Sequence, residues 1–154
     1  MKPSLRKGIG FGLTSGIITT LGLIVGLHSG TGSRDVVISG IVVIAIADGL
    51  SDALGVHISE EAGKNTTAHI WEATICTFLA KFFTAMLFIL PILFLEISIA
   101  IFTSIIMGIG LIALFSYYIS MHDKNPYRPV FEHIFIAVLV VAISHLIGSF
   151  LHTF

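Results

Sequence analysis

Five long stretches of this sequence carry little charge, and they constrain the fold more than any other feature. Each is about as long as an α-helix must be to cross the hydrocarbon core of a bilayer. They cover residues 8–28, 36–58, 72–95, 97–121 and 131–152. Of the 154 residues, 55% are hydrophobic and only 11% are charged, which excludes an ordinary soluble domain. The sequence therefore predicts an all-α membrane protein with one domain, residues 1–154, and five transmembrane helices.

The basic residues predict how these helices are oriented. Lys2, Arg6 and Lys7 precede the first span, and further basic residues follow the second and fourth spans. The connections after the first and third spans together contain one Lys or Arg residue, Arg34. Because cytoplasmic loops carry an excess of Lys and Arg, we expect the N-terminus in the cytoplasm. An odd number of spans then places the C-terminus outside the cell or in a lumen.

Two aspartates interrupt the second span. Asp48 falls near its middle and Asp52 follows one helical turn later, in the segment ADGLSDALGVHISEE. An aspartate at the centre of a spanning helix costs roughly 2.5–3.5 kcal/mol on insertion scales, and such residues usually mark ion or proton pathways. Carboxylate oxygens suit a divalent cation or a proton, so we predict Asp48 and Asp52 as metal or proton sites. The alternative is that they are neutral or paired and only hold helices together.

A polar face continues from Asp52 toward the expected cytoplasmic end. Residues three or four positions apart share one face of a helix, and this spacing joins Asp52 to Gly55 and Ser59, which we predict to line a pathway. Glu60 and Glu61 follow, and we predict that they collect metal cations at its mouth. A solvated acidic helix end explains these two glutamates equally well.

Lys81 lies in the third span, about a third of the way in from the expected cytoplasmic end. Asp52 is expected at a similar depth, so an ion pair between them is sterically reasonable and would offset both desolvation costs. In that pair Lys81 would compete with any cation for Asp52. The alternative is that Lys81 extends its amine to the membrane interface.

Small residues form a stripe along the first span. Their spacing alternates between four and three residues, which places them on one side of the helix; they are Gly8, Gly12, Ser15, Thr19, Gly22 and Gly26. Small residues let two membrane helices approach closely, so the stripe predicts a packing face. The pattern leaves open whether its partner belongs to the same chain or to a second copy.

Several other classes of function lack support. The single Cys76 cannot form an intrachain disulfide and has no neighbouring Cys or His in the sequence. An HExxH motif, a phosphate-binding loop and a nucleophile paired with a base are all missing, so we expect no enzymatic activity. No basic cluster indicates nucleic acid as a partner.

Two segments resemble the vacuolar iron transporter family. The first span, RKGIGFGLTSGIITTLGL from Arg6, resembles the opening helix of that family, and ADGLSDALGVHISEEA from Ala47 is similar to its second-helix motif. Five spans, the proline late in the third span and the SHLIGSFL ending agree with it. The resemblance implies a homodimer that associates through its first helices, with a pathway between the two copies. It implies export of Fe²⁺ or Mn²⁺ from the cytoplasm, coupled to protons.

The chain departs from that family at the ligand positions. Ser15 stands where the family has an aspartate, Asp52 where it has a methionine, and Val56 where it has a glutamate. Asp48 replaces a glycine, and the long acidic insert that some members carry after the second helix is missing. Replacing a thioether by a carboxylate shifts the preference toward harder cations. We expect Ser15 and Thr19 to supply neutral oxygens facing Asp48 and Asp52.

These observations lead to one hypothesis and two alternatives. The leading hypothesis is a dimeric Fe²⁺ or Mn²⁺ exporter that works by proton exchange and has no permanently bound cofactor. Its expected location is the cell membrane of a prokaryote, or a vacuolar or other organelle membrane of a eukaryote. The first alternative is a non-transporting relative in which Asp52 and Lys81 lock two helices together. The second is an assembly partner for a larger complex.

Overall fold

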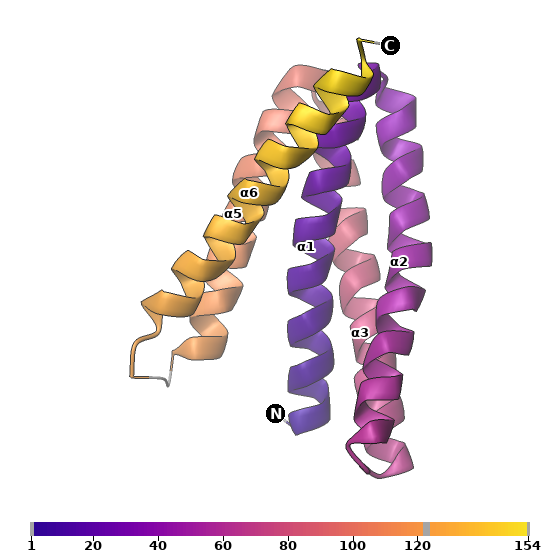
Figure 1. Ribbon diagram of the computed structural model, residues 1–154, viewed down its shortest axis with the longest axis vertical. Coiled ribbons are helices and arrows are strands. Elements are labelled where there is room, and N and C mark those ends of the chain that lie inside the picture. The colour runs from indigo at the N-terminus through magenta and orange to yellow at the C-terminus, as the bar shows by residue number, and fades with distance from the viewer. Residues whose placement is uncertain (1, 122–123, 154) are drawn as a thin grey trace.

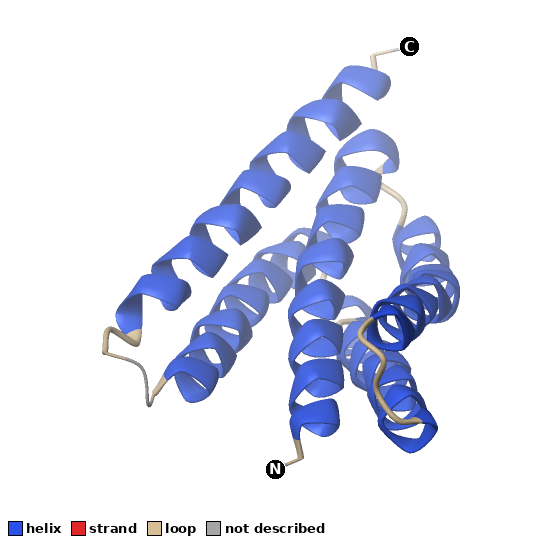
Figure 2. Cartoon of the chain, turned by 60° about the horizontal axis from the view of Figure 1, so that its bottom comes forward, coloured by secondary structure: helices blue, strands red, loops and turns tan. Residues whose placement is uncertain are grey.

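The computed structural model describes residues 2–121 and 124–153, and its secondary structure is entirely helical over that part of the chain (Figure 2). The helices are α1 (Pro3–Thr31), α2 (Arg34–Ala62), α3 (Thr67–Leu87), α4 (Ile89–Phe94), α5 (Ile97–Ser120) and α6 (Tyr127–Leu151). Helices α3 and α4 together form one apolar segment. Counted in this way, the described residues contain five segments that are long and apolar enough to cross a membrane, which confirms the predicted all-α fold and the number of candidate spans.

Helix α1 lies at the centre of the molecule (Figure 1). It packs against α2 and α3 on one side and against α5 and α6 on the other. The two termini lie at opposite ends of the molecule, as an odd number of spans requires (Figure 1). The side that faces the cytoplasm stays a prediction from the basic residues.

The glycines of α1 explain its close packing within the chain. A Cβ atom at Gly12 would lie 2.5 Å from the carbonyl oxygen of Thr77 in α3. Toward the other end of α1, a Cβ atom at Gly148 in α6 would lie 2.3 Å from the carbonyl oxygen of Gly26. Real Cβ atoms do not approach a backbone oxygen so closely, so only glycine permits these contacts. The glycine stripe therefore serves contacts between helices of one chain, and a homodimer through α1 stays a prediction on other grounds.

The third span is interrupted near its far end. Helix α3 ends at Leu87, and α4 begins at Ile89, two residues before Pro91. Proline has no backbone N–H, so Pro91 cannot hydrogen-bond the carbonyl of Leu87 and an unbroken helix is lost here. Arg34 at the start of α2 stabilises the end of this segment, because its guanidinium donates a 2.7 Å hydrogen bond to the carbonyl oxygen of Leu95.

Large apolar side chains cover the outside of the helices. Examples with more than half of their surface exposed are Leu50, Leu54, Phe83, Phe102, Phe131 and Leu146. In water such a surface would be unfavourable, whereas in a bilayer it contacts lipid chains. The apolar helices are thus compatible with an integral, multi-pass membrane protein.

Candidate functional site

A buried charge cluster joins α1, α2 and α3. At its centre is Lys81, which is only 1% exposed. Its ammonium lies 2.5 Å from Oδ2 of Asp52 and also forms an ion pair with Oδ2 of Asp48. It donates a hydrogen bond of 2.9 Å to the hydroxyl oxygen of Ser15. We call Ser15, Asp48, Asp52 and Lys81 the charge cluster.

The helix geometry explains why both aspartates reach one ammonium. Asp48 and Asp52 are four residues apart on α2, so their side chains lie on the same face, one turn from each other. Ser15 on α1 donates a 2.6 Å hydrogen bond to Oδ2 of Asp52 and holds that carboxylate from the other side. Thr19 does not join them, because its hydroxyl donates to the backbone carbonyl of Ser15 at 2.8 Å. Of the two hydroxyls that we expected to face the aspartates, that of Ser15 hydrogen-bonds Asp52, whereas that of Thr19 is directed to its own helix.

The charges of this cluster do not balance when all three ionisable groups are charged. One ammonium then faces two carboxylates, which leaves a formal excess of one negative charge. The aspartate side chains keep some exposure, 33% for Asp48 and 19% for Asp52, while the Lys81 side chain has 1%. The unbalanced negative charge therefore lies on the aspartates, which are the partly exposed members of the cluster.

A groove leads away from Asp52. Its volume is about 330 Å³, and its walls are Lys7 and Phe11 of α1 and Ser51, Asp52, Gly55, Val56, Ser59 and Glu60 of α2. Gly55 and Ser59, which we predicted to line a pathway, thus share one groove with Asp52. The small side chains at these two positions leave the space between α1 and α2 that a bulkier residue would fill.

Glu60, at the other end of this groove, is surrounded by hydrogen-bond donors. It is only 2% exposed. Its carboxylate accepts 2.6 Å from Nζ of Lys7 and 3.0 Å from Nδ2 of Asn65, and lies 3.0 Å from Nε2 of His69. Because its oxygens are occupied in this way, Glu60 is a structural anchor that connects α1, α2 and α3. Little of its hydrogen-bonding capacity is left for a further ligand.

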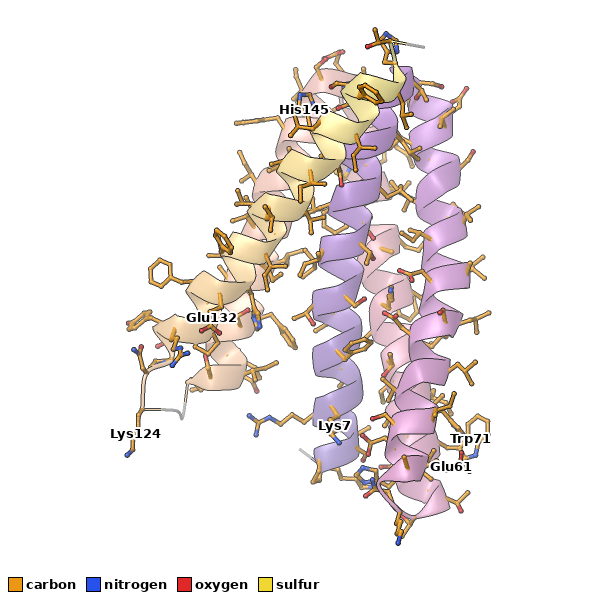
Figure 3. The ribbon with its side chains drawn as sticks, in the orientation of Figure 1. Lys7, Glu61, Trp71, Lys124, Glu132 and His145 are labelled. Atoms are coloured by element: carbon orange, nitrogen blue, oxygen red, sulfur yellow. The ribbon has the colours of Figure 1, made fainter. Side chains whose placement is uncertain are left out.

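Glu61 occupies a different surface. It is exposed, at the same end of the molecule as Lys7 (Figure 3). Neighbouring residues on a helix point in directions about 100° apart, so Glu60 and Glu61 cannot face one groove together. Of the two glutamates predicted at the mouth, only Glu60 lines the groove.

The four acids predicted as metal ligands do not meet at one point. Glu60 follows Asp52 by eight residues, which is about 12 Å along a helix axis at 1.5 Å per residue. In residues 2–121 and 124–153, no three His, Cys, Asp or Glu side chains lie close enough together to hold a metal ion. Asp48 and Asp52 are therefore the candidate ion-binding pair, and Glu60 marks a separate position along the groove.

Sequence reasoning missed several partners in this region. It considered Asp52 alone for Lys81, although Asp48 shares the same helix face and the four-residue spacing was a usable signal. It also missed the contacts of Glu60 with Lys7 and His69, because the relative register of separate helices is not visible in the sequence. A further ion pair at this end, between Lys2 and Glu72 at 2.7 Å, was missed for the same reason.

Comparisons with known proteins add no assignment: no protein-family model, no curated protein and no solved structure matches this chain. The similarity of the first two spans to the vacuolar iron transporter family therefore stays a prediction from sequence motifs. The functional argument has to rest on the charge cluster and on the groove beside it.

Proposed function

We propose that this protein is a cation transporter in which Asp48 and Asp52 bind the transported ion and Lys81 competes with it. The observation that supports the proposal is the buried ammonium of Lys81 between two carboxylates within the predicted membrane spans. Ionisable groups at such depth are costly and usually belong to ion or proton pathways. The groove that ends at Asp52 would supply a route to that carboxylate.

Competition between Lys81 and the ion gives a physical basis for exchange. A divalent cation held by both aspartates carries the charge that the ammonium would otherwise neutralise. Two positive charges a few ångströms apart repel strongly where water is scarce, so Lys81 must move away or release its proton when the ion binds. Protonation from the opposite side restores the ammonium or neutralises the aspartates, and the ion leaves. Metal and protons then move in opposite directions.

Fe²⁺ or Mn²⁺ is the proposed cargo, and export from the cytoplasm is the proposed direction. Both rest on the resemblance of the first two spans to the vacuolar iron transporter family. The oxygen-only environment of Ser15, Asp48 and Asp52 favours the harder Mn²⁺. A homodimer would place two such grooves opposite each other, because each groove lies open between α1 and α2.

A second candidate is a helix lock without transport. The same contacts favour it: the Lys81 ammonium has a partner on α1 and two on α2 while it is attached to α3. A buried cation that is fully paired can simply hold three helices in register. The two candidates differ in whether an ion can displace Lys81.

A measurement of ion binding distinguishes the transporter from the helix lock. We would titrate Mn²⁺ into the purified protein, follow the free ion by electron paramagnetic resonance, and follow proton release with a pH dye. The transporter proposal predicts binding with proton release in the wild type. It predicts loss of both in Asp48→Asn with Asp52→Asn, and also when Lys81→Met is added to avoid an unpaired buried ammonium.

Asp35→Asn is the matched control, because Asp35 is an exposed aspartate at the start of the same helix. It should bind Mn²⁺ like the wild type. Absence of binding in a folded wild-type protein, or equal binding after both aspartates are replaced, would overturn the transporter proposal. The first of these outcomes would favour the helix lock.

A further inference from the structure

A second groove runs between α1 and α5, on another face of α1. It is apolar and has a volume of about 390 Å³, with walls from α1 (Leu13, Ile17), α3 (Thr84, Leu87) and α5 (Leu111, Leu114, Phe115, Tyr118). Figure 1 shows the reason for it: α5 and α6 lean away from α1 toward the N-terminal end of the molecule. Inside a bilayer an apolar opening of this kind is filled by hydrocarbon rather than water.

A separate polar pocket lies nearer the N-terminal end of α1. Arg6, Gly10, Leu13 and Ile17 follow each other at intervals of four, three and four residues, so they lie on one face of α1. Arg6 and Gly10 line a pocket of about 570 Å³, whose other walls are Pro3 and Lys7 of α1, Glu60 of α2, Asn65, His69 of α3 and Ile119 of α5. The two openings share no wall residue, but α1 and α5 contribute to both, and Gly10 of the polar pocket precedes Leu13 of the apolar groove by three residues.

Arg6 is the basic residue at this junction that has no acidic partner among the described residues. Lys2 pairs with Glu72, and Lys7 pairs with Glu60. Arg6 instead donates one 3.2 Å hydrogen bond to the backbone carbonyl of Ile119. A guanidinium has five N–H donors, so most of its capacity is left for an anion, and its planar fork matches a phosphate.

Other features of this end also suit a lipid headgroup. Tyr118, at the rim of the apolar groove, is 65% exposed, and tyrosines are frequent at the level of lipid headgroups. Lys124, on the connection between α5 and α6, is exposed and lies at the same end of the molecule as Lys7 (Figure 3). Positive charge at this end therefore adds to that of Arg6.

We propose that the groove between α1 and α5 binds one anionic glycerophospholipid, with its phosphate at Arg6 and an acyl chain along Leu13, Ile17 and Leu114. The two requirements of such a ligand, a negative headgroup and a long apolar tail, match Arg6 in the polar pocket and the apolar groove further along α1. Basic pockets between transmembrane helices are known to hold anionic headgroups in this way. The apolar groove lies on a different face of α1 from the charge cluster, whereas the polar pocket shares Lys7 and Glu60 with the groove that leads to Asp52.

Lipid retention tests this site directly. The full chain would be purified in mild detergent with equal amounts of phosphatidylglycerol and phosphatidylcholine that have identical acyl chains, and bound lipid would be identified by native mass spectrometry. We expect one retained lipid per chain and a preference for phosphatidylglycerol. Arg6→Gln should reduce that preference about fivefold, the effect of one basic residue at a membrane surface. Lys64→Gln, which removes an exposed charge elsewhere at the same end, should leave it unchanged.

A second pair of variants tests the apolar part. Leu114→Trp fills the groove and should lower the retention of both lipids, whereas Leu146→Trp on the exposed surface of α6 should not. Equal lipid preference in the wild type and Arg6→Gln would overturn the proposal. Dimers that contain no retained lipid, and that Leu114→Trp dissociates, would also overturn it and assign the groove to a second copy of the chain.

Discussion

Lys81 is among the largest fully buried side chains of the described residues, and its two aspartate partners determine the charge balance between the helices. Its expected depth, similar to that of Asp52, was visible in the sequence because both residues sit in runs that must cross the same bilayer. The place of Asp48 in the charge cluster could be predicted from helix periodicity alone, because Asp48 lies one turn before Asp52. The contribution of Ser15 depends on how α1 rotates against α2, which no local pattern determines.

Removing the ammonium should destabilise the protein. Lys81→Met leaves Asp48 and Asp52 facing each other without a counter-charge, so we expect a loss of about 3–5 kcal/mol in the free energy of unfolding. Unfolding in mixed detergent micelles, followed by circular dichroism, measures it. Adding Asp48→Asn and Asp52→Asn removes the unpaired charges and should restore most of the loss. A single variant as stable as the wild type would show that the ion pairs contribute nothing to stability.

The adjacent glutamates should respond differently to the same change. Glu60→Gln weakens buried contacts with Lys7 and His69, so we expect a loss of about 1–3 kcal/mol in the free energy of unfolding. Glu61→Gln alters an exposed residue and should stay within about 0.5 kcal/mol of the wild type. Both are measured by the same unfolding assay. Equal losses for the two variants would contradict the assignment of Glu60 as an anchor.

At the scale of the helices, α1 was recognisable as a packing element before its partners were known. The repeat of small residues predicts close approach, because such residues let backbones come together wherever they meet. It cannot name the partner, since α3, α6 and a second copy of α1 would all accept the same stripe. The structure assigns Gly12 to α3 and Gly26 to α6.

A methyl group at the contact of α1 with α3 should separate the two helices. Gly12→Ala places a Cβ atom 2.5 Å from the backbone oxygen of Thr77, which cannot rotate away as a side chain would. Gly110→Ala on α5 is the matched control, because a Cβ atom there meets no atom within 4 Å. We expect a lower melting temperature for Gly12→Ala only, measured by thermal unfolding in detergent. Similar melting temperatures for both variants would mean that α1 and α3 do not pack this closely.

At the scale of the whole molecule, the five spans were predictable because lipid imposes a minimum length and an apolar composition on every crossing helix. The ends of the helices were harder to predict than their number. The first helix begins at Pro3, before the apolar run, because its first turn is held by contacts outside the expected span. One such contact is the 2.7 Å hydrogen bond from Ser4 to Glu72. The outward lean of α5 and α6 depends on packing between residues that are distant in the sequence, so the hydrophobic periodicity of the sequence does not predict it.

The predicted orientation can be tested in whole cells. In a Cys76→Ser background, we would introduce Lys64→Cys between α2 and α3, and separately Thr153→Cys beyond α6. Basic residues are concentrated at the end of the molecule where Lys64 lies, which predicts that this end is cytoplasmic. A membrane-impermeant thiol reagent should therefore label position 153 in intact cells and position 64 only after lysis. The reverse pattern would invert the topology, and labelling of both from outside would contradict five spans.

The most direct test of the central claim is transport by the purified protein in sealed liposomes. Uptake of Fe²⁺, Mn²⁺ and other divalent ions would be measured with and without a pH gradient, for the wild type, for Asp48→Asn with Asp52→Asn, and for Asp35→Asn. We predict uptake that depends on the gradient in the wild type and in Asp35→Asn, and none when both buried aspartates are replaced. No uptake of any ion by a folded wild-type protein, or undiminished uptake without the two aspartates, would contradict the account.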